Sequence, residues 1–315
     1  MRSFAIIFLL FLVGVAAWLI WDKLTRRTPH EAPRKEEVLE ISDTSSAPEA
    51  KTPERRHEKA QENAAPASQP NSQHSSNKPE LSSYVTLSRA LAKGPSCLYV
   101  QHTHYGLCYD EEHEQPRWTV YILSGEKLNE GRIRRTQDFR PDPKIPTRSA
   151  QLSDYKKSGY DRGHLVPAGD FKWDSIGMSE TFYLSNMSPQ LHEFNAGIWE
   201  EVESTVRAWA RQKKVLVVYT GPILDKVRNR IGTSKVSVPP AFYKVVYHID
   251  EKKPAAVGFI VPHAPSQKSP MSFLVSVDSV ERVTGIDFFY ELPDEVEEQV
   301  ERRFERSQWE VKQRR

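Results

Sequence analysis

A change of composition near residue 82 constrains the fold of this chain more than any other feature. Residues 28–82 contain no Phe, Trp or Tyr and are rich in Pro, Ser, Ala, Glu, Lys and Gln. Such a segment cannot bury enough apolar surface to offset the entropy lost on ordering. We therefore expect a disordered polar linker there, between a membrane segment at 1–27 and a globular domain at 83–292. A charged C-terminal helix is expected at 293–315.

An uncharged apolar run spans Phe4–Trp21. As a helix it would be about 27 Å long, which is roughly the thickness of a hydrocarbon core. The run predicts a signal anchor that stays in the membrane as a transmembrane helix. A cleaved signal peptide is the alternative, because residues 15–17 (Val-Ala-Ala) offer small side chains to a peptidase. Basic residues within 23–27 conflict with export of the rest of the chain, because the positive-inside rule keeps such residues in the cytoplasm.

Bulk charge is nearly balanced, with 44 Lys and Arg against 42 Asp and Glu in 315 residues. A nucleic-acid partner must therefore be argued from a site rather than from net charge. Cys97 and Cys108 cannot supply a four-ligand zinc site; their spacing suits one disulfide across a short hairpin, with two free thiols as the alternative. His102 and His104 form a pair on an expected strand, but no third metal ligand is obvious.

Apolar patterning after residue 84 predicts a mixed fold. Runs rich in Val, Ile, Tyr and Phe, bounded by Gly, Pro or charged turns, are typical of strands. One stretch instead carries its apolar residues at helical spacing and predicts a helix over 195–212. The strands are expected at 117–123, 214–224, 241–249, 255–262 and 273–277.

Two polar motifs carry the chemistry. The first is YDRGHLVPAGDF at 160–171, and the second is FYLSNMSPQLHEFNAGIWEEVE at 182–203. Taken singly, His164 reads as an ordinary histidine, Asn195 as a helix cap and Glu203 as a solvated carboxylate. On a regular helix Asn195 and Glu203 would lie two turns and about 80° apart, so one hydrated ion could bridge them.

These motifs resemble those of the DNA/RNA non-specific endonucleases, a family that includes mitochondrial endonuclease G and secreted bacterial nucleases. The likeness covers residues 99–292 with several motifs in family order, including QPRWTVYIL at 115–123, PPAFYKVVY at 239–247 and SVERVTGIDFF at 279–289. The resemblance implies an α+β fold. A central antiparallel sheet would be flanked by helices and would carry a ββα-metal active site.

The resemblance also implies a role for each matching residue. His164 would be the general base, and Asn195 the direct ligand of Mg²⁺, with Mn²⁺ as a substitute metal. Glu203 would hold the metal through water, and Arg162 would contact the scissile phosphate. Asn186 would help to set the geometry of the histidine and the metal. The roles agree with elementary chemistry, because neutral histidine accepts a proton near pH 7 and Mg²⁺ prefers oxygen ligands and water.

The chain departs from the family pattern at one position. Some members carry a further phosphate-contacting arginine upstream, where this chain reads RIRRTQDFRPDP at 132–143. Alignment on the Asp-Pro pair puts Gln137 at that position, and either Arg135 or Arg140 fills the role after a small shift. The basic residues of 132–135 also fit an ordinary solvated loop.

The sequence thus predicts a magnesium-dependent endonuclease acting on DNA and RNA with little regard for sequence. Alternatives are a phosphodiesterase for a lipid or cyclic nucleotide, a catalytically idle nucleic-acid-binding module, and a membrane-anchored scaffold. Further expected partners are the membrane through the N-terminal helix, a second copy in a homodimer, and an inhibitor protein. A non-specific nuclease would attack its own genome, so we expect the domain outside the cytoplasm. A bacterial periplasm is favoured, with a mitochondrial membrane as the alternative.

Overall fold

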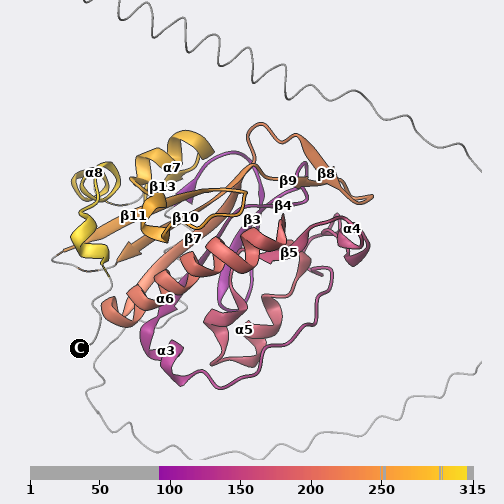
Figure 1. The fold of residues 1–315 in the computed structure, drawn as a ribbon, viewed down its shortest axis with the longest axis horizontal. Helices are drawn as coiled ribbons and strands as arrows, with labels where there is room; N and C mark the ends of the chain where they lie inside the picture. The colour runs from indigo at the N-terminus through magenta and orange to yellow at the C-terminus, as the bar shows by residue number, and fades with distance from the viewer. Residues whose placement is uncertain (1–91, 249, 251–252, 291, 293, 311–315) are drawn as a thin grey trace, which may run out of the picture. The chain divides into compact units, whose positions relative to one another are not determined.

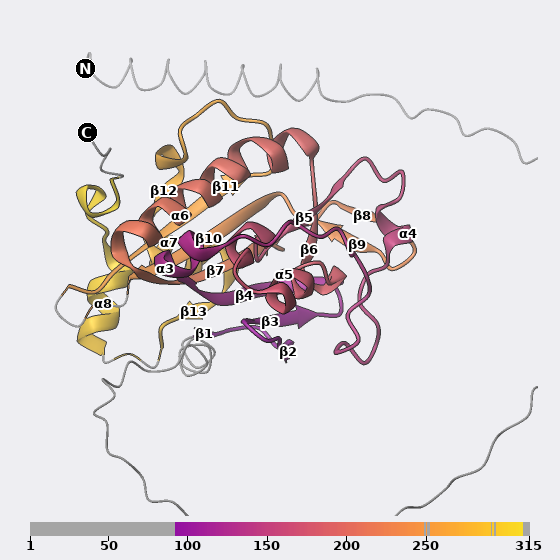
Figure 2. The ribbon, with the colours of Figure 1, turned by 90° about the horizontal axis from the view of Figure 1, so that it is seen from below.

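Seven antiparallel strands form the central sheet of the protein in a computed structural model (Figures 1 and 2). The structure describes residues 92–248, 250, 253–290, 292 and 294–310. The strand order across the sheet is β12-β11-β10-β7-β4-β3-β2. These strands are β2 (Leu98–Gln101), β3 (Tyr105–Asp110), β4 (Gln115–Ser124), β7 (Val215–Ile223), β10 (Ala241–His248), β11 (Ala255–Pro262) and β12 (Leu274–Val275). The predicted mixed fold with a central antiparallel sheet is confirmed.

Three two-stranded ribbons accompany the sheet. The ribbon that carries the first polar motif pairs β5 (Asp161–His164) with β6 (Met187–Gln190). The other two pair β1 (Ala92–Lys93) with β13 (Asp287–Phe288), and β8 (Asn229–Ile231) with β9 (Val236–Val238).

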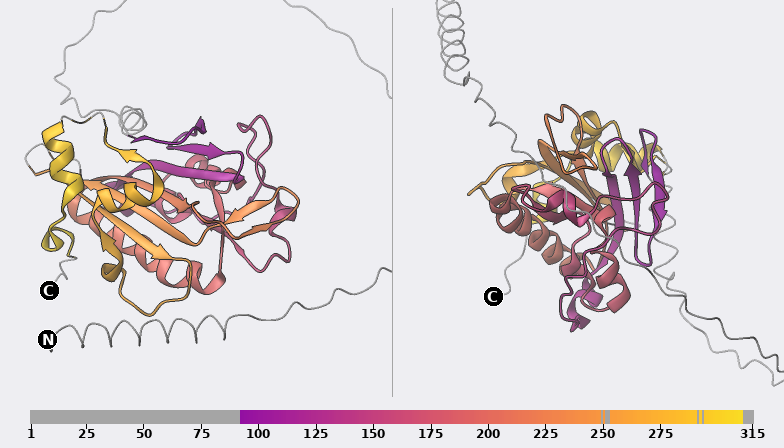
Figure 3. Two further views of the ribbon diagram at one scale, coloured as in Figure 1. Left: turned by 90° about the horizontal axis from the view of Figure 1, so that it is seen from above. Right: turned by 90° about the vertical axis from the view of Figure 1, so that its right-hand side faces the viewer.

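Helices cover both faces of the sheet (Figures 1 and 3). One face packs against α6 (Glu200–Lys213), with α3 (Gly125–Glu130) and α5 (Ser175–Glu180) on the same side, and the other packs against α7 (Val277–Thr284) and α8 (Asp294–Arg302). A further short helix, α4 (Leu152–Tyr155), precedes β5. Strands buried on both faces read as continuous apolar runs, which is why the central strands were predictable.

Side chains of β10 show how the two cores alternate. Phe242 and Val246 belong to the core beneath α6, whereas Tyr243 and Val245 belong to the core beneath α7 and α8. Lys244 falls on the α6 face because successive side chains of a strand point to opposite faces. It pairs in register with Thr220 of β7, so a polar row crosses an otherwise apolar face.

The predicted strand at 273–277 is wrong in extent. Only Leu274–Val275 form β12, between a 3-10 turn (Pro270–Phe273) and α7. Ser276 ends the strand because its hydroxyl accepts a hydrogen bond from the backbone N–H of Ser279 and caps α7.

The predicted helix at 195–212 is present but irregular at its start. A π-helical segment, Phe194–Trp199, precedes α6, and Gly197 within it has φ −110° and ψ −115°, outside the helical range. The angle of about 80° expected between Asn195 and Glu203 on a regular helix therefore does not apply, because the helix is interrupted at Gly197 between them.

The strands β2 and β3 form a hairpin that a disulfide between Cys97 and Cys108 closes, with their Cα atoms 5.4 Å apart. The expectation that His102 and His104 lie on a strand is wrong, since both occupy the turn between β2 and β3. His102 Nε2 lies 3.0 Å from Asp142, and His104 Nε2 lies 3.3 Å from Asp174. The two imidazoles thus serve separate carboxylates.

The charged C-terminal segment also has buried side chains. Val300 and Glu301 of α8 are buried, and Trp309 beyond it is fully buried against Trp209 of α6, with ring centroids 4.8 Å apart. The segment therefore contributes to both cores, with α8 on one face and Trp309 on the other.

The predicted transmembrane segment at 1–27 and the linker at 28–82 lie outside the described residues. Among the helices that are described, none is both long and apolar enough to cross a membrane.

Candidate active site

The ribbon β5–β6 brings the two polar motifs together. Arg162 pairs with Pro189, and His164 pairs with Met187, although 23 or more residues separate the partners in the chain. Gly163 lies between them, and a Cβ there would collide with the side chain of Gln190. The glycine in the DRGH string thus leaves room for the buried side chain of Gln190 from β6. In Figures 1 and 2 this ribbon lies near the first turn of α6.

His164 is the last residue of β5 and is buried, with 8% of its surface exposed. Its ring packs edge-on against Phe182 at 4.9 Å and against Phe139 at 5.8 Å between centroids. Its Nε2 atom is buried without a hydrogen-bond partner among the described residues. Burial, together with the nearby charges of Arg135 and Arg162, lowers the pKa of His164 to about 3. The imidazole is therefore neutral at physiological pH.

Asn186 fixes the chain directly after His164. Its side chain is fully buried, and its Oδ1 accepts a hydrogen bond from the Val166 N–H at 3.0 Å. Its Nδ2 donates to the carbonyl oxygens of Val166 at 3.0 Å and Thr181 at 2.9 Å. The amide thus uses both ends on backbone, and it positions the histidine without lying in the cleft described below.

A carboxylate orients Asn195. The Asn195 Nδ2 donates to Asp161 Oδ2 at 3.0 Å, and His192 Nδ1 lies 2.9 Å from the same oxygen. A carboxylate only accepts hydrogen bonds, so the amide nitrogen must face it and the amide oxygen must point away. Asp161 therefore leaves the Asn195 Oδ1 available as a neutral oxygen ligand.

A cleft of about 490 Å³ is lined by two of the motif residues, Arg162 and Asn195, whereas His164 and Asn186 are not among its lining residues. Arg162 lies over the ring of Phe139, with 4.1 Å from its Cζ to the ring centroid, and Arg135 lies over Phe182 at 5.2 Å. Arg135, Phe139, Tyr160, Asp161, Arg162 and Asn195 are among the lining residues. Two guanidinium groups at one cleft, each lying over an aromatic ring, form a site for an anion.

The structure distinguishes the candidates for the upstream arginine. Arg140 donates to the Ser179 carbonyl at 3.1 Å and to Asp138 at 2.7 Å, and it stacks on Tyr183 at 4.1 Å. These contacts hold it in the scaffold, whereas Arg135 lines the cleft. The position that simple alignment indicates, Gln137, is exposed and does not line this cleft.

Glu203 lies in the first turn of α6 with 15% of its side chain exposed. Burial raises its pKa to about 7, while the positive charges of Lys244 and Arg207 act in the opposite direction. Its carboxylate is 3.7 Å from Arg207 Nη1. Glu203 does not line the arginine cleft. It lies instead in a separate group of buried charges with Arg207, Asp170 and Lys244.

That group contains residues that the sequence did not reveal. Arg207 lies 3.1 Å from Asp170, which accepts a hydrogen bond of 2.6 Å from the Tyr121 hydroxyl. Lys244 is fully buried on the same face, donates to Thr220 Oγ1 at 2.8 Å, and has its pKa lowered by burial to about 8. A lysine inside the apolar run AFYKVVY was the one available signal, because an unpaired lysine is rarely buried.

A larger cavity of about 740 Å³ lies on the other side of Tyr160. Leu191, Pro240 and His263 line it, and it contains none of the predicted site residues. Of these two hollows, only the smaller cleft is lined by predicted site residues, namely Arg135, Arg162 and Asn195.

The antiparallel sheet, the β5–β6 ribbon and the arginine-lined cleft together define a protein of the nuclease class. A sequence model of the DNA/RNA non-specific endonucleases matches residues 88–295. The chain belongs to this family.

Relatives that match the chain are also named as nucleases. The mitochondrial nuclease EXOG of Danio rerio is 39% identical over 206 residues, which cover 60% of this chain and 60% of the relative. The mitochondrial endonuclease G of Homo sapiens is 34% identical over 200 residues, covering 58% of this chain and 67% of the relative. The chain thus spans about three fifths of the EXOG relative and two thirds of endonuclease G.

A crystal structure of an EndoG/EndoGI complex, titled as showing the mechanism of EndoG inhibition, contains a similar fold. Its matching chain superposes with a TM-score of 0.62 at 30% identity, covering 70% of this chain and 95% of that chain.

Proposed function

We propose that this protein is a magnesium-dependent endonuclease that hydrolyses phosphodiester bonds of DNA and RNA. The observation that carries the proposal is the buried, neutral His164, whose Nε2 has no partner among the described residues, beside two ring-stacked arginines. A neutral imidazole next to an anion-binding cleft suits proton abstraction from water during attack on a phosphate.

His164 acts as the general base. Its low pKa keeps it neutral, but a base with a pKa of about 3 is weak. Substrate would offset part of this shift, because a phosphate bound at Arg135 and Arg162 cancels the two positive charges that lower the pKa besides burial. The histidine would then become more basic when substrate is bound.

The donor set fits a hard divalent cation. The Asn195 Oδ1 is a neutral oxygen that Asp161 turns away from itself, and a neutral ligand leaves the charge of the ion uncancelled. Asn195 would hold Mg²⁺ directly and Glu203 would hold it through water, with Mn²⁺ as a substitute. The ion, when bound, supplies charge stabilisation for the phosphate and the leaving oxygen.

Arg162 and Arg135 bind the phosphate. Each presents a planar guanidinium, and stacking on Phe139 and Phe182 limits its motion before substrate arrives. Contacts of this kind address phosphate and carry no information about the base, which accounts for cleavage of both DNA and RNA.

The proposed location and partners of the domain rest on its disulfide and on its relatives. The disulfide between Cys97 and Cys108 suits an oxidising space outside the cytoplasm. Relatives named as mitochondrial nucleases favour the mitochondrial alternative over the periplasm. The similar structure of an EndoG/EndoGI complex supports an inhibitor protein as a partner. The homodimer and the membrane anchor stay predictions.

Cleavage by the full chain tests the function. Supercoiled plasmid and single-stranded RNA are incubated with Mg²⁺ or with EDTA, beside His164→Ala and the control His248→Ala, which changes a histidine near the far end of α6. We expect Mg²⁺-dependent loss of both substrates, and a reduction of about 10²–10⁴-fold in His164→Ala alone. Near-normal cleavage by folded His164→Ala would refute the assignment of the base.

A further inference from the structure

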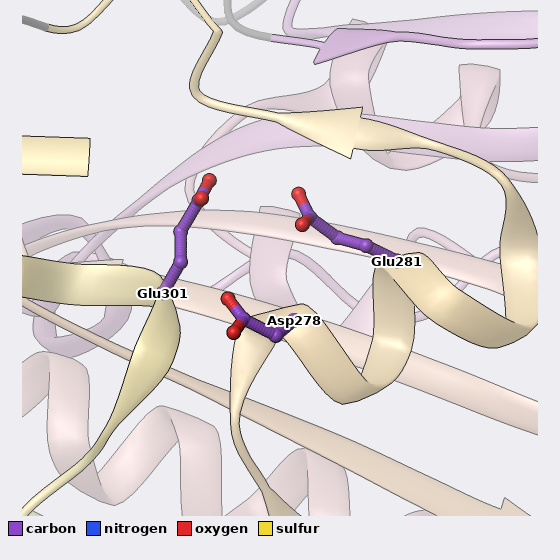
Figure 4. A group of neighbouring side chains, drawn as sticks. All are labelled: Asp278, Glu281 and Glu301. Carbon is purple, nitrogen blue, oxygen red and sulfur yellow. The ribbon is translucent and has the colours of Figure 1, made fainter. Parts of the chain in front are cut away.

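Five carboxylates gather on the face of the sheet opposite α6. The ligand oxygens of Asp278, Glu281 and Glu301 lie within 4.8 Å of one another, and those of Asp287, Glu297 and Glu301 do so as well. Glu301 belongs to both groups. Figure 4 shows that Asp278 and Glu281 project from α7, and Glu301 from the end of α8, toward a common space.

Glu301 is buried without compensation. It is 8% exposed, and its Oε1 has no hydrogen-bond partner among the described residues. A buried carboxylate without a partner is costly, so such a group calls for an explanation such as a bound ion. Glu281 Oε1 accepts a hydrogen bond from the Phe288 N–H at 2.7 Å, and its carboxylate faces the space shared with Asp278 and Glu301 (Figure 4).

Positive charge is also lacking around the cluster. Within the described part of the chain, no lysine, arginine or histidine forms an ion pair with any of the five carboxylates. Burial, together with the charges of the neighbouring carboxylates, raises the pKa of Glu281 to about 7 and that of Glu301 to about 9. The cluster must therefore take up either protons or a cation.

We propose that Asp278, Glu281 and Glu301 form a second divalent-cation site, which binds Ca²⁺ and is separate from the catalytic site. Asp287 and Glu297 extend the same oxygen-rich surface. Ca²⁺ accepts six to eight oxygens in irregular arrangements, whereas Mg²⁺ retains its waters and zinc prefers nitrogen and sulfur. The carboxylates of this cluster come from α7, α8 and β13, and such an irregular set of oxygens suits Ca²⁺.

The site would have a structural purpose. It joins α8 to α7, and the side chains of Val280 and Val300 from these helices pack in the same core. An ion between the helices would remove the repulsion among the carboxylates and hold α8 in place. It would lie on the face opposite Glu203 and Lys244, so it would take no part in the chemistry.

Thermal unfolding and calorimetry of the full chain test the site. The protein is stripped with EDTA, dialysed, and titrated with CaCl₂ as wild type, Glu301→Gln and Glu298→Gln. The last is a matched control, since Glu298 lies on the same helix but is exposed and paired with Arg302. We expect Ca²⁺ at about 100 times Kd to raise the Tm of wild type and Glu298→Gln by about 5–10 °C. Glu301→Gln should abolish this shift and weaken binding at least tenfold.

Asn195→Ala separates the two cation sites. The calcium-induced rise in Tm should persist in this variant, because only the catalytic ligand is lost. If Glu301→Gln fails to fold, Glu281→Gln serves as the second variant with the same expected loss of binding. A wild-type Tm that responds to pH but not to Ca²⁺ would overturn the proposal, because the carboxylates would then hold protons instead. An undiminished Ca²⁺ response in both Gln variants would overturn it equally.

Discussion

The substitution Asn186→Asp tests whether the buried amide fixes the position of His164. It preserves the shape of the side chain and the acceptor for the Val166 N–H, but it removes the donors to the carbonyls of Val166 and Thr181. A protonated carboxyl retains one donor, so at low pH the variant loses one hydrogen bond, which costs about 1 kcal/mol. An ionised carboxyl would face two carbonyl oxygens in a fully buried place.

The size of the effect depends on pH. Burial and the two carbonyls would raise the folded-state pKa of the introduced carboxyl above its unfolded value of about 3.9. A carboxyl whose folded pKa is raised loses stability as pH rises above the unfolded pKa, by about 1.4 kcal/mol for each unit until the folded pKa is reached. The variant should therefore be less stable than wild type by about 2–3 kcal/mol at pH 5 and about 5 kcal/mol at pH 7.

Urea unfolding at pH 5 and pH 7 measures this difference. Asn229→Asp is the matched control, because Asn229 is exposed on β8 and should show little change at either pH. Cleavage by Asn186→Asp should fall about 10²-fold even where the protein is folded, since a displacement of about 1 Å at a catalytic group has that effect. The same loss of stability at both pH values would refute the reasoning, because it would show that the carboxyl is solvated.

Two further expectations concern the cleft. Phe139→Leu removes the ring beneath Arg162 but keeps an apolar wall against His164. Because the cation–π contact is lost, KM for plasmid should rise roughly 2–10-fold with little change in kcat. A fall in kcat alone would contradict this expectation. Asn195→Ala should weaken Mg²⁺ activation and lower the rate together, measured by titrating Mg²⁺ in the plasmid assay. An unchanged titration curve would argue against Asn195 as a ligand.

The fold was largely predictable because its central strands are buried on both faces. Runs such as 214–224 and 255–262 are apolar throughout, and they became β7 and β11. The strand predicted at 273–277 was too long because Ser276 caps a helix. The pattern of apolar residues on which the prediction relied does not reveal a capping serine. The break at Gly197 was equally invisible, since a helical spacing of apolar residues continues through it.

The candidate site was predictable only where motifs carried it. DRGH and its partner motif singled out His164, Arg162 and Asn195 as candidates. They did not show that Asp161, although it belongs to the DRGH string, orients Asn195, which lies 34 residues further along the chain. Lys244 approaches Glu203 only because the strand β10 passes beneath α6. Such contacts depend on the tertiary fold, and no local pattern encodes them.

The acidic cluster escaped prediction for a related reason. Charged residues on a helix usually face solvent, and the sequence after residue 293 fits that pattern. Only the packing of α8 on α7 turns Glu301 inward.

The two phenylalanines of the cleft limit how the site can be re-engineered. Phe139 and Phe182 each carry a guanidinium on the face of the ring, and each also forms part of the apolar wall around His164. A change to either ring that opens this wall therefore alters substrate affinity and the pH response of the base at once. Because the charges of Arg135 and Arg162 also lower the pKa of His164, a designer who wants tighter binding with an unchanged pH optimum must alter the surrounding loop. Selection in nature would meet the same coupling, so the rings and the arginines should vary together.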